Sequence, residues 1–174
     1  MDISRFIISG CLFIFSYALH RKLTFKEFKK VGVAIYADGV EDIKLIYDKI
    51  SNISDFIHID IVDKSFNPNC KEVKAYRAEV VRAYWQNKSI EVHLMSRTPS
   101  IWLEDLIPFV DIIYIHPSID ENFSEIIDYI NSRNVKAGIA ISIYESIDVI
   151  DTYIQNSKVK NILLLTIPNP GFSG

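Results

Sequence analysis

Cysteine, clustered positive charge and glycine-rich segments are scarce in this chain, and each scarcity excludes a class of protein. The two cysteines, Cys11 and Cys70, form neither a disulfide framework nor a cysteine-based metal site, which predicts a reducing, cytoplasmic location. Lysine and arginine are scattered through a chain of net charge −3, without a basic arm or stripe, so we expect no nucleic-acid partner. The segment YADGVED holds a single glycine and offers no glycine-rich phosphate loop of the dinucleotide-binding kind.

Hydrophobic runs long enough to cross a membrane are also missing. The apolar segment at residues 6–19 (FIISGCLFIFSYAL) falls short of the roughly 20 residues that a span needs, which argues against a membrane partner. An extra apolar element packed on the domain, a membrane or export segment, and a non-native start of the chain remain open for it. We interpret residues 1–29 as an apolar N-terminal extension and residues 30–174 as one domain, large enough to bury a core.

Runs rich in valine, isoleucine and leucine alternate with segments of helical apolar spacing from residue 30 onward, which predicts a parallel α/β fold. The predicted strands lie at residues 31–36, 56–62, 90–94, 112–115, 137–141 and 161–167. The predicted helices lie at residues 40–50, 71–86, 100–109, 124–131 and 146–155. Polar residues suited to helix capping precede several of them, namely Asp38, Thr98 and Ser100.

Two arrangements of such a sheet compete, the doubly wound sheet and the closed (β/α)8 TIM-type barrel. A doubly wound sheet would be expected to carry a glycine-rich loop after its first strand, and the chain has none there. Polar residues instead recur near the ends of consecutive strands, where a barrel places its site. A complete barrel needs eight strands in roughly 200–250 residues. The sequence therefore predicts an incomplete barrel of about six βα units.

The candidate site lies in two strand segments, HIDIVD and EVHLM. His58 and Asp60 share one strand face because alternate side chains point the same way, and His93 from the next strand can meet them. Two imidazoles and one carboxylate are suitable ligands for a divalent metal. The competing interpretation is that the histidines are hydrogen-bonded core residues. We leave His116 outside the metal site, as a packing residue at a strand end, and we expect Asp63 either to cap the loop or to serve as an acid.

Several segments, in their order and spacing, resemble the ribulose-phosphate 3-epimerase family from about residue 31 to residue 174. The segments that carry the resemblance are HIDIVDKSFNPN, EVHLM, a strand ending in IHP, KAGIAI and TIPNPGFSG. The resemblance implies a ribulose-phosphate binding barrel. It also implies an isomerase of the pentose phosphate pathway that interconverts D-ribulose 5-phosphate and D-xylulose 5-phosphate with a divalent metal, Zn²⁺ first and Fe²⁺, Mn²⁺ or Co²⁺ as alternatives.

The resemblance also assigns roles to residues of this chain. His58, Asp60 and His93 match metal ligands, and Asp60 matches an acid/base that works through an enediolate. Met95 matches a methionine beside the metal. The implied substrate-binding residues, for a sugar phosphate, are His93, Gly171, Phe172, Ser173 and Gly174.

Departures from the family pattern keep a second interpretation open. The family's second catalytic carboxylate lies on a seventh strand, and a serine that contacts the sugar falls on Val33 here; Lys64 replaces a glycine. The chain is therefore either an epimerase or a shortened, non-catalytic relative that binds metal or a partner chain, for example as a homo-oligomer through its open sheet edges. A piece of a longer epimerase is the third alternative.

Overall fold

The computed structural model describes residues 30–36, 42–70, 75–146, 148, 151–153, 158–159 and 161–166. The chain separates into two compact units, Met1–Lys30 and Val31–Gly174. The predicted apolar extension at residues 1–29 and the predicted substrate-binding residues Gly171, Phe172, Ser173 and Gly174 lie outside the described residues.

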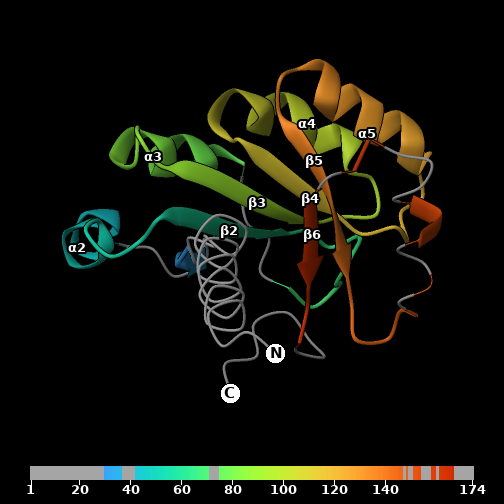
Figure 1. Ribbon diagram of the computed structural model, residues 1–174, viewed down its shortest axis with the longest axis horizontal. Helices are drawn as coiled ribbons and strands as arrows, with labels where there is room; N and C mark the ends of the chain where they lie inside the picture. The colour runs from blue at the N-terminus through green and yellow to red at the C-terminus, as the bar shows by residue number, and fades with distance from the viewer. Residues whose placement is uncertain are drawn as a thin grey trace, which may run out of the picture. The chain divides into compact units, whose positions relative to one another are not determined.

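Six parallel strands form one sheet in the order β1-β2-β3-β4-β5-β6 (Figure 1). The strands are β1 (Gly32–Tyr36), β2 (Phe56–Val62), β3 (Ser89–Met95), β4 (Ile112–Ile115), β5 (Lys136–Ile141) and β6 (Asn161–Leu164). A doubly wound sheet reverses its strand order at a switch point, whereas a barrel adds each strand beside the preceding one. The sequential order confirms the predicted incomplete (β/α)8 barrel. Of the six strands, β6 departs most from its predicted bounds, because it ends before residues 165–167.

Helices connect the strands and cover one face of the sheet. They are α2 (Ile43–Ile50), α3 (Tyr76–Tyr84), α4 (Ser100–Leu106), the 3-10 turn η1 (Ile107–Phe109) and α5 (Phe123–Ser132). Figure 1 shows α3, α4 and α5 along the same side of the sheet. Within the predicted helix at 146–155, the described helical residues are 148 and 151–153. Among the described helices, none has the length and apolar character needed to cross a membrane.

The core lies between the sheet and these helices. On β2, Ile57, Ile59 and Ile61 have no exposed surface, and Ile90, Val92 and Leu94 of β3 are equally buried. They pack with buried helix residues, among them Ala78, Leu103, Leu106, Ile127 and Ile130. Burial against the helices explains why every second residue of these strands is aliphatic. The alternate residues of β2 and β3 face the opposite, inner side, where the polar side chains are.

Helix capping differs from its prediction. Asp42 accepts a hydrogen bond from the Leu45 amide at the start of α2, and Asn122 caps α5 in the same way. Thr98 and Ser100 do not cap α4. Instead, the Glu121 carboxylate from the loop after β4 accepts from the Ser100 amide at 3.0 Å. A residue distant in sequence therefore satisfies this helix end, which local capping patterns cannot predict. Asp38 lies outside the described residues.

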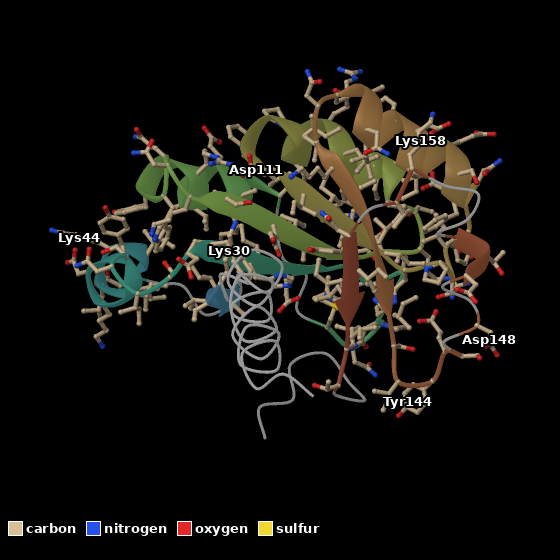
Figure 2. The ribbon with its side chains drawn as sticks, viewed as in Figure 1. Lys30, Lys44, Asp111, Tyr144, Asp148 and Lys158 are labelled. Carbon is tan, nitrogen blue, oxygen red and sulfur yellow. The ribbon has the colours of Figure 1, made fainter. Side chains whose placement is uncertain are left out.

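The N-terminal edge of the strands is held by Arg82 of α3. Its guanidinium donates to the Phe109 and Lys88 carbonyls at 2.9 and 3.0 Å and to the Asp111 carboxylate at 2.6 Å. Figure 2 shows Asp111 far from Tyr144, which follows the C-terminal end of β5. In barrels of this type the N-terminal edge contributes to stability, whereas chemistry is done at the C-terminal edge. The candidate site is therefore expected at the C-terminal ends of the strands.

Candidate metal centre

The register of β2 and β3 brings the predicted site residues together. These strands pair in parallel, with Asp60 opposite His93 and His58 opposite Glu91. Residues two apart on a strand share a face, so all four side chains lie on the inner face of the sheet. Asp60 and His93 are in the C-terminal halves of their strands, where a barrel builds its site.

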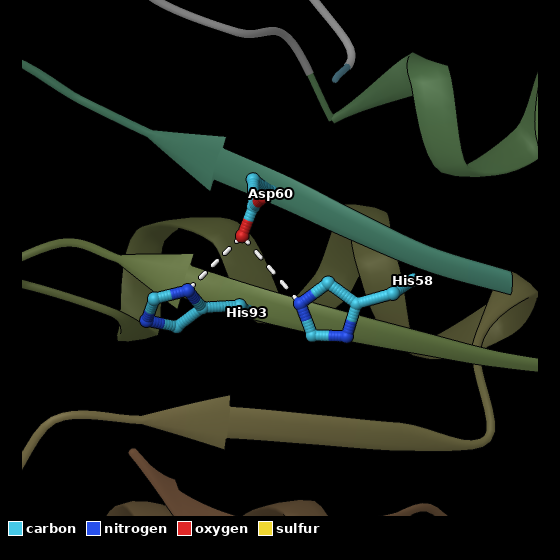
Figure 3. A group of neighbouring side chains, drawn as sticks. All are labelled: His58, Asp60 and His93. Atoms are coloured by element: carbon cyan, nitrogen blue, oxygen red, sulfur yellow. Dashed lines mark hydrogen bonds and ion pairs between the residues drawn. The ribbon is translucent and has the colours of Figure 1, made fainter. Parts of the chain in front are cut away.

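The Asp60 carboxylate stands between the two imidazoles (Figure 3). Its Oδ1 lies 3.1 Å from His93 Nδ1 and 3.5 Å from His58 Nε2. Two ligands of one tetrahedral cation, each about 2.1 Å from it, are about 3.4 Å apart. One ligand atom from each of the three residues lies within 4.8 Å of the others. The group can therefore hold a metal ion.

A second carboxylate, Glu91, lies on the inner face, two residues before His93 on β3. It was not predicted from the sequence as part of the site. Its Oε2 is 3.8 Å from His58 Nδ1, and the Tyr114 hydroxyl donates to the same oxygen at 3.4 Å. Glu91 therefore faces the nitrogen of His58 that points away from Asp60. The signal was present in the sequence, because Glu91 is two residues before His93 and so shares its strand face.

His116 lies just after β4 and also touches the group. Its Nε2 is 2.9 Å from His93 Nε2, and its side chain is buried. Burial and the neighbouring His93 lower the pKa of His116 to about 3, so the ring is neutral at neutral pH. His116 is not part of the group formed by His58, Asp60 and His93. Its hydrogen bond to His93 is a contact that the prediction of simple packing did not include.

Asp63 caps the loop after β2 and does not face the metal group. Its Oδ1 accepts from the Ser65 amide at 2.8 Å, the Ser65 hydroxyl and the Phe66 amide, and its Oδ2 accepts from Trp102 Nε1 at 2.8 Å. Burial opposes these donors, yet together they lower the pKa of the Asp63 carboxyl. Of its two predicted roles, the structure supports loop capping. A carboxylate that accepts this many hydrogen bonds is poorly suited to exchange protons.

Two further sequence assignments can be placed. Val33 pairs with Ile57, whose side chain faces the helices, so Val33 lies on the outer face of the sheet. Ala34, opposite His58, lies on the inner face. The position on which the family's serine falls therefore lies on the face opposite the metal group in this chain. Met95 is buried and shares the inner face of β3 with His93.

The charges of the site are coupled. Burial lowers the pKa of His58, but the Asp60 and Glu91 carboxylates outweigh burial and raise it to about 9. Burial likewise opposes ionisation of Asp60, yet the two imidazoles hold the pKa of its carboxyl well below the usual range. Without a cation, the group is therefore a protonated His58 beside an ionised Asp60, and a bound cation would take the place of the His58 proton.

This coupling predicts how the stability of the metal-free protein depends on pH. The His58 pKa is raised above its ordinary 6.5, so its stabilising contribution is complete below pH 6.5 and is lost as pH rises through about 9. We expect the melting temperature of the chelator-treated protein to fall over this window. A His58→Gln variant should lack that fall. A wild-type melting temperature that is constant from pH 6.5 to 9 would contradict the prediction.

Comparison with known proteins shows which proteins the chain is similar to. The model of the Ribulose-phosphate 3 epimerase family matches residues 31–174. The chain is 34% identical over 152 residues to the ribulose-phosphate 3-epimerase of Chlamydia muridarum, covering 84% of this chain and 64% of that protein. It is 30% identical over 122 residues to that of Bacillus subtilis, covering 70% of this chain and 54% of the relative. The chain thus spans less than two thirds of the length of these curated relatives.

Proposed function

Because this chain belongs to the ribulose-phosphate 3-epimerase family, we propose that it catalyses the metal-dependent interconversion of D-ribulose 5-phosphate and D-xylulose 5-phosphate. The observation that carries the proposal is the convergence of His58, Asp60 and His93 within 4.8 Å on the inner face of the barrel. The substrate is accordingly a small sugar phosphate. We place the reaction in the cytoplasm, and association into a homo-oligomer stays a prediction.

The three residues fit a divalent cation, with Zn²⁺ as the first choice and Fe²⁺, Mn²⁺ or Co²⁺ as alternatives, since imidazole and carboxylate suit all of them. His58 would bind through Nε2 and His93 through Nδ1, the two atoms that face Asp60. When bound, the cation would stabilise negative charge that develops on substrate oxygens.

Asp60 is the residue proposed to move the proton. Epimerisation removes the proton from the carbon beside the carbonyl, through an enediolate, and returns a proton to the opposite face of that carbon. The Asp60 side chain keeps 28% of its surface exposed, whereas His93 keeps 3%. The carboxylate is thus the member of the group that a substrate reaches most easily. Its ionised form, favoured by both imidazoles, is the form that accepts a proton.

The second face of the carbon needs a second acid. In the part of the chain that the structure describes, no further carboxylate joins the metal group. The Asp63 carboxylate already accepts hydrogen bonds, including one from Trp102, and the Glu91 carboxylate contacts His58 and Tyr114. This observation supports the second candidate function, a non-catalytic relative that binds a metal or a partner chain without turnover.

Proton exchange separates the two functions. The zinc-loaded 174-residue chain is incubated with D-ribulose 5-phosphate in deuterated water, and NMR follows deuterium at C3 together with the formation of D-xylulose 5-phosphate. We expect deuterium at C3, since Asp60 serves at least one face. Zinc binding without any exchange would favour the non-catalytic function. A chain that neither binds zinc nor exchanges the proton would refute the catalytic function and the metal-binding form of the non-catalytic one.

A further inference from the structure

Both nitrogens of the His93 ring are engaged, and this fixes its orientation. Nδ1 lies 3.1 Å from Asp60 Oδ1, and Nε2 lies 2.9 Å from His116 Nε2. The two histidines keep 3% and 4% of their surface exposed, so water has little access to compete for these bonds. A rotation of the His93 ring would break both contacts in a buried setting, where lost hydrogen bonds are costly.

The orientation of His93 decides which nitrogen can bind a cation. Nδ1 faces Asp60 and the metal group, so Nδ1 must offer its lone pair, and the proton of the neutral ring must then sit on Nε2. That N–H needs an acceptor. His116 Nε2 is the atom within hydrogen-bond distance. Ligand histidines generally donate their second N–H to an outer partner, usually a carboxylate, a carbonyl or water, and here the partner is another imidazole.

The partner is itself held in place. The Phe66 ring packs against the His116 ring with centroids 4.9 Å apart. Phe66 belongs to the loop after β2, whose backbone is tied to the Asp63 carboxylate through the Phe66 amide at 3.1 Å. The loop-capping role of Asp63 thus extends to the site, because it orders the residue that packs on His116.

We propose that His116 is a positioning residue, which accepts the Nε2–H of His93 and so presents His93 Nδ1 to the cation while touching neither the cation nor the substrate. This inference rests on the metal site of the proposed function and goes beyond it by assigning a role to a residue outside the metal group.

Three substitutions at position 116 test the proposal. His116→Phe keeps a ring against Phe66 but removes the acceptor. His116→Gln carries an amide oxygen roughly where Nε2 lies, and His116→Asn carries the same amide one methylene shorter, too far back to reach His93. The Gln and Asn variants therefore form a matched pair that differs in reach. Zn²⁺ affinity is measured by competition with a chelator, and the tautomer of His93 in the zinc-loaded protein by nitrogen-15 NMR.

The expected result is a loss of about 10–100-fold in Zn²⁺ affinity for His116→Phe and His116→Asn, the usual cost of losing an outer partner, with recovery in His116→Gln. The His93 signals should lose their single Nε2–H tautomer in the first two variants and keep it in the third. Wild-type affinity and an unchanged tautomer in His116→Phe would overturn the positioning role and leave the metal site intact. A wild-type protein that binds no Zn²⁺ would overturn the metal site, and the positioning role with it.

Discussion

Replacing Asp60 with asparagine is expected to weaken zinc binding and to slow proton exchange by orders of magnitude. A single atom, Asp60 Oδ1, faces His58 Nε2 and His93 Nδ1, so the carboxylate joins the whole group. Asparagine has nearly the same shape but no charge and no proton-accepting carboxylate. Loss of a general base lowers such rates by about 10²–10⁴-fold. The loss of an anionic ligand should weaken Zn²⁺ binding as well.

The measurement is deuterium incorporation at C3, together with Zn²⁺ titration of the same preparation. Asp128→Asn is the matched control, because it makes the same aspartate-to-asparagine change on the exposed surface of α5. There, Asp128 pairs with Lys158 at 2.8 Å. The control should keep wild-type exchange and affinity. If Asp60→Asn retained both properties, Asp60 would be neither a ligand nor a base, and the proposed mechanism would be wrong.

Gly138→Ala is expected to destabilise the fold from within the barrel. A Cβ at position 138 would lie 2.4 Å from a ring carbon of Tyr114 and 3.1 Å from the Asn161 carbonyl oxygen. The Tyr114 ring has little room to move, since it is 7% exposed, packs with Ile112 and Ala140, and is bonded to Glu91 through its hydroxyl. Overpacking of this kind costs about 1–3 kcal/mol in the free energy of unfolding.

Denaturant unfolding of four proteins measures this clash: wild type, Gly138→Ala, Tyr114→Leu and the double variant. The cost of Gly138→Ala should be much smaller in the Tyr114→Leu background, because the ring carbons that the Cβ meets have been removed and the longer contact with the Asn161 carbonyl oxygen remains. Equal costs in both backgrounds would contradict the steric explanation. Glu91 connects Tyr114 to His58, so Gly138→Ala should also weaken Zn²⁺ binding. Glycine at position 138, in the segment KAGIAI, thus leaves room for the Tyr114 ring.

The strands could be predicted closely from the sequence because of how the sheet is buried. Helices cover its outer face, and residues such as Ile57, Ile59 and Val92 have no exposed surface. Such burial leaves aliphatic runs that are visible without a structure. The helix starts were predicted less well, since α4 is completed by Glu121 from another loop and no local pattern records that contact.

The metal group could be predicted for a related reason. His58 and Asp60 share a face through strand alternation alone, and His93 follows on the next strand, which lies beside β2 in a barrel. Strand alternation also places Glu91 on the inner face, but the contacts that Glu91 and His116 make with the imidazoles could not be predicted in this way. His116 and Glu91 were missed as partners of the imidazoles because their contacts depend on side-chain directions across three strands. The face on which Val33 lies was likewise decided by the register, because a shift of one residue moves a side chain to the opposite face.

The amino-acid sequence by itself determined the alternation of strands and helices, which follows from periodicity, and the three residues that can hold a cation, which follow from residue types at short spacing. It also determined the family, through the resemblance of several segments to that family. Only the tertiary structure decided which nitrogen of each histidine faces Asp60. It also decided that Asp63 caps its loop, and that Glu91 contacts His58 and His116 contacts His93. Those facts arise from atoms of separate strands meeting at hydrogen-bond distances, and such distances exist only once the sheet has formed.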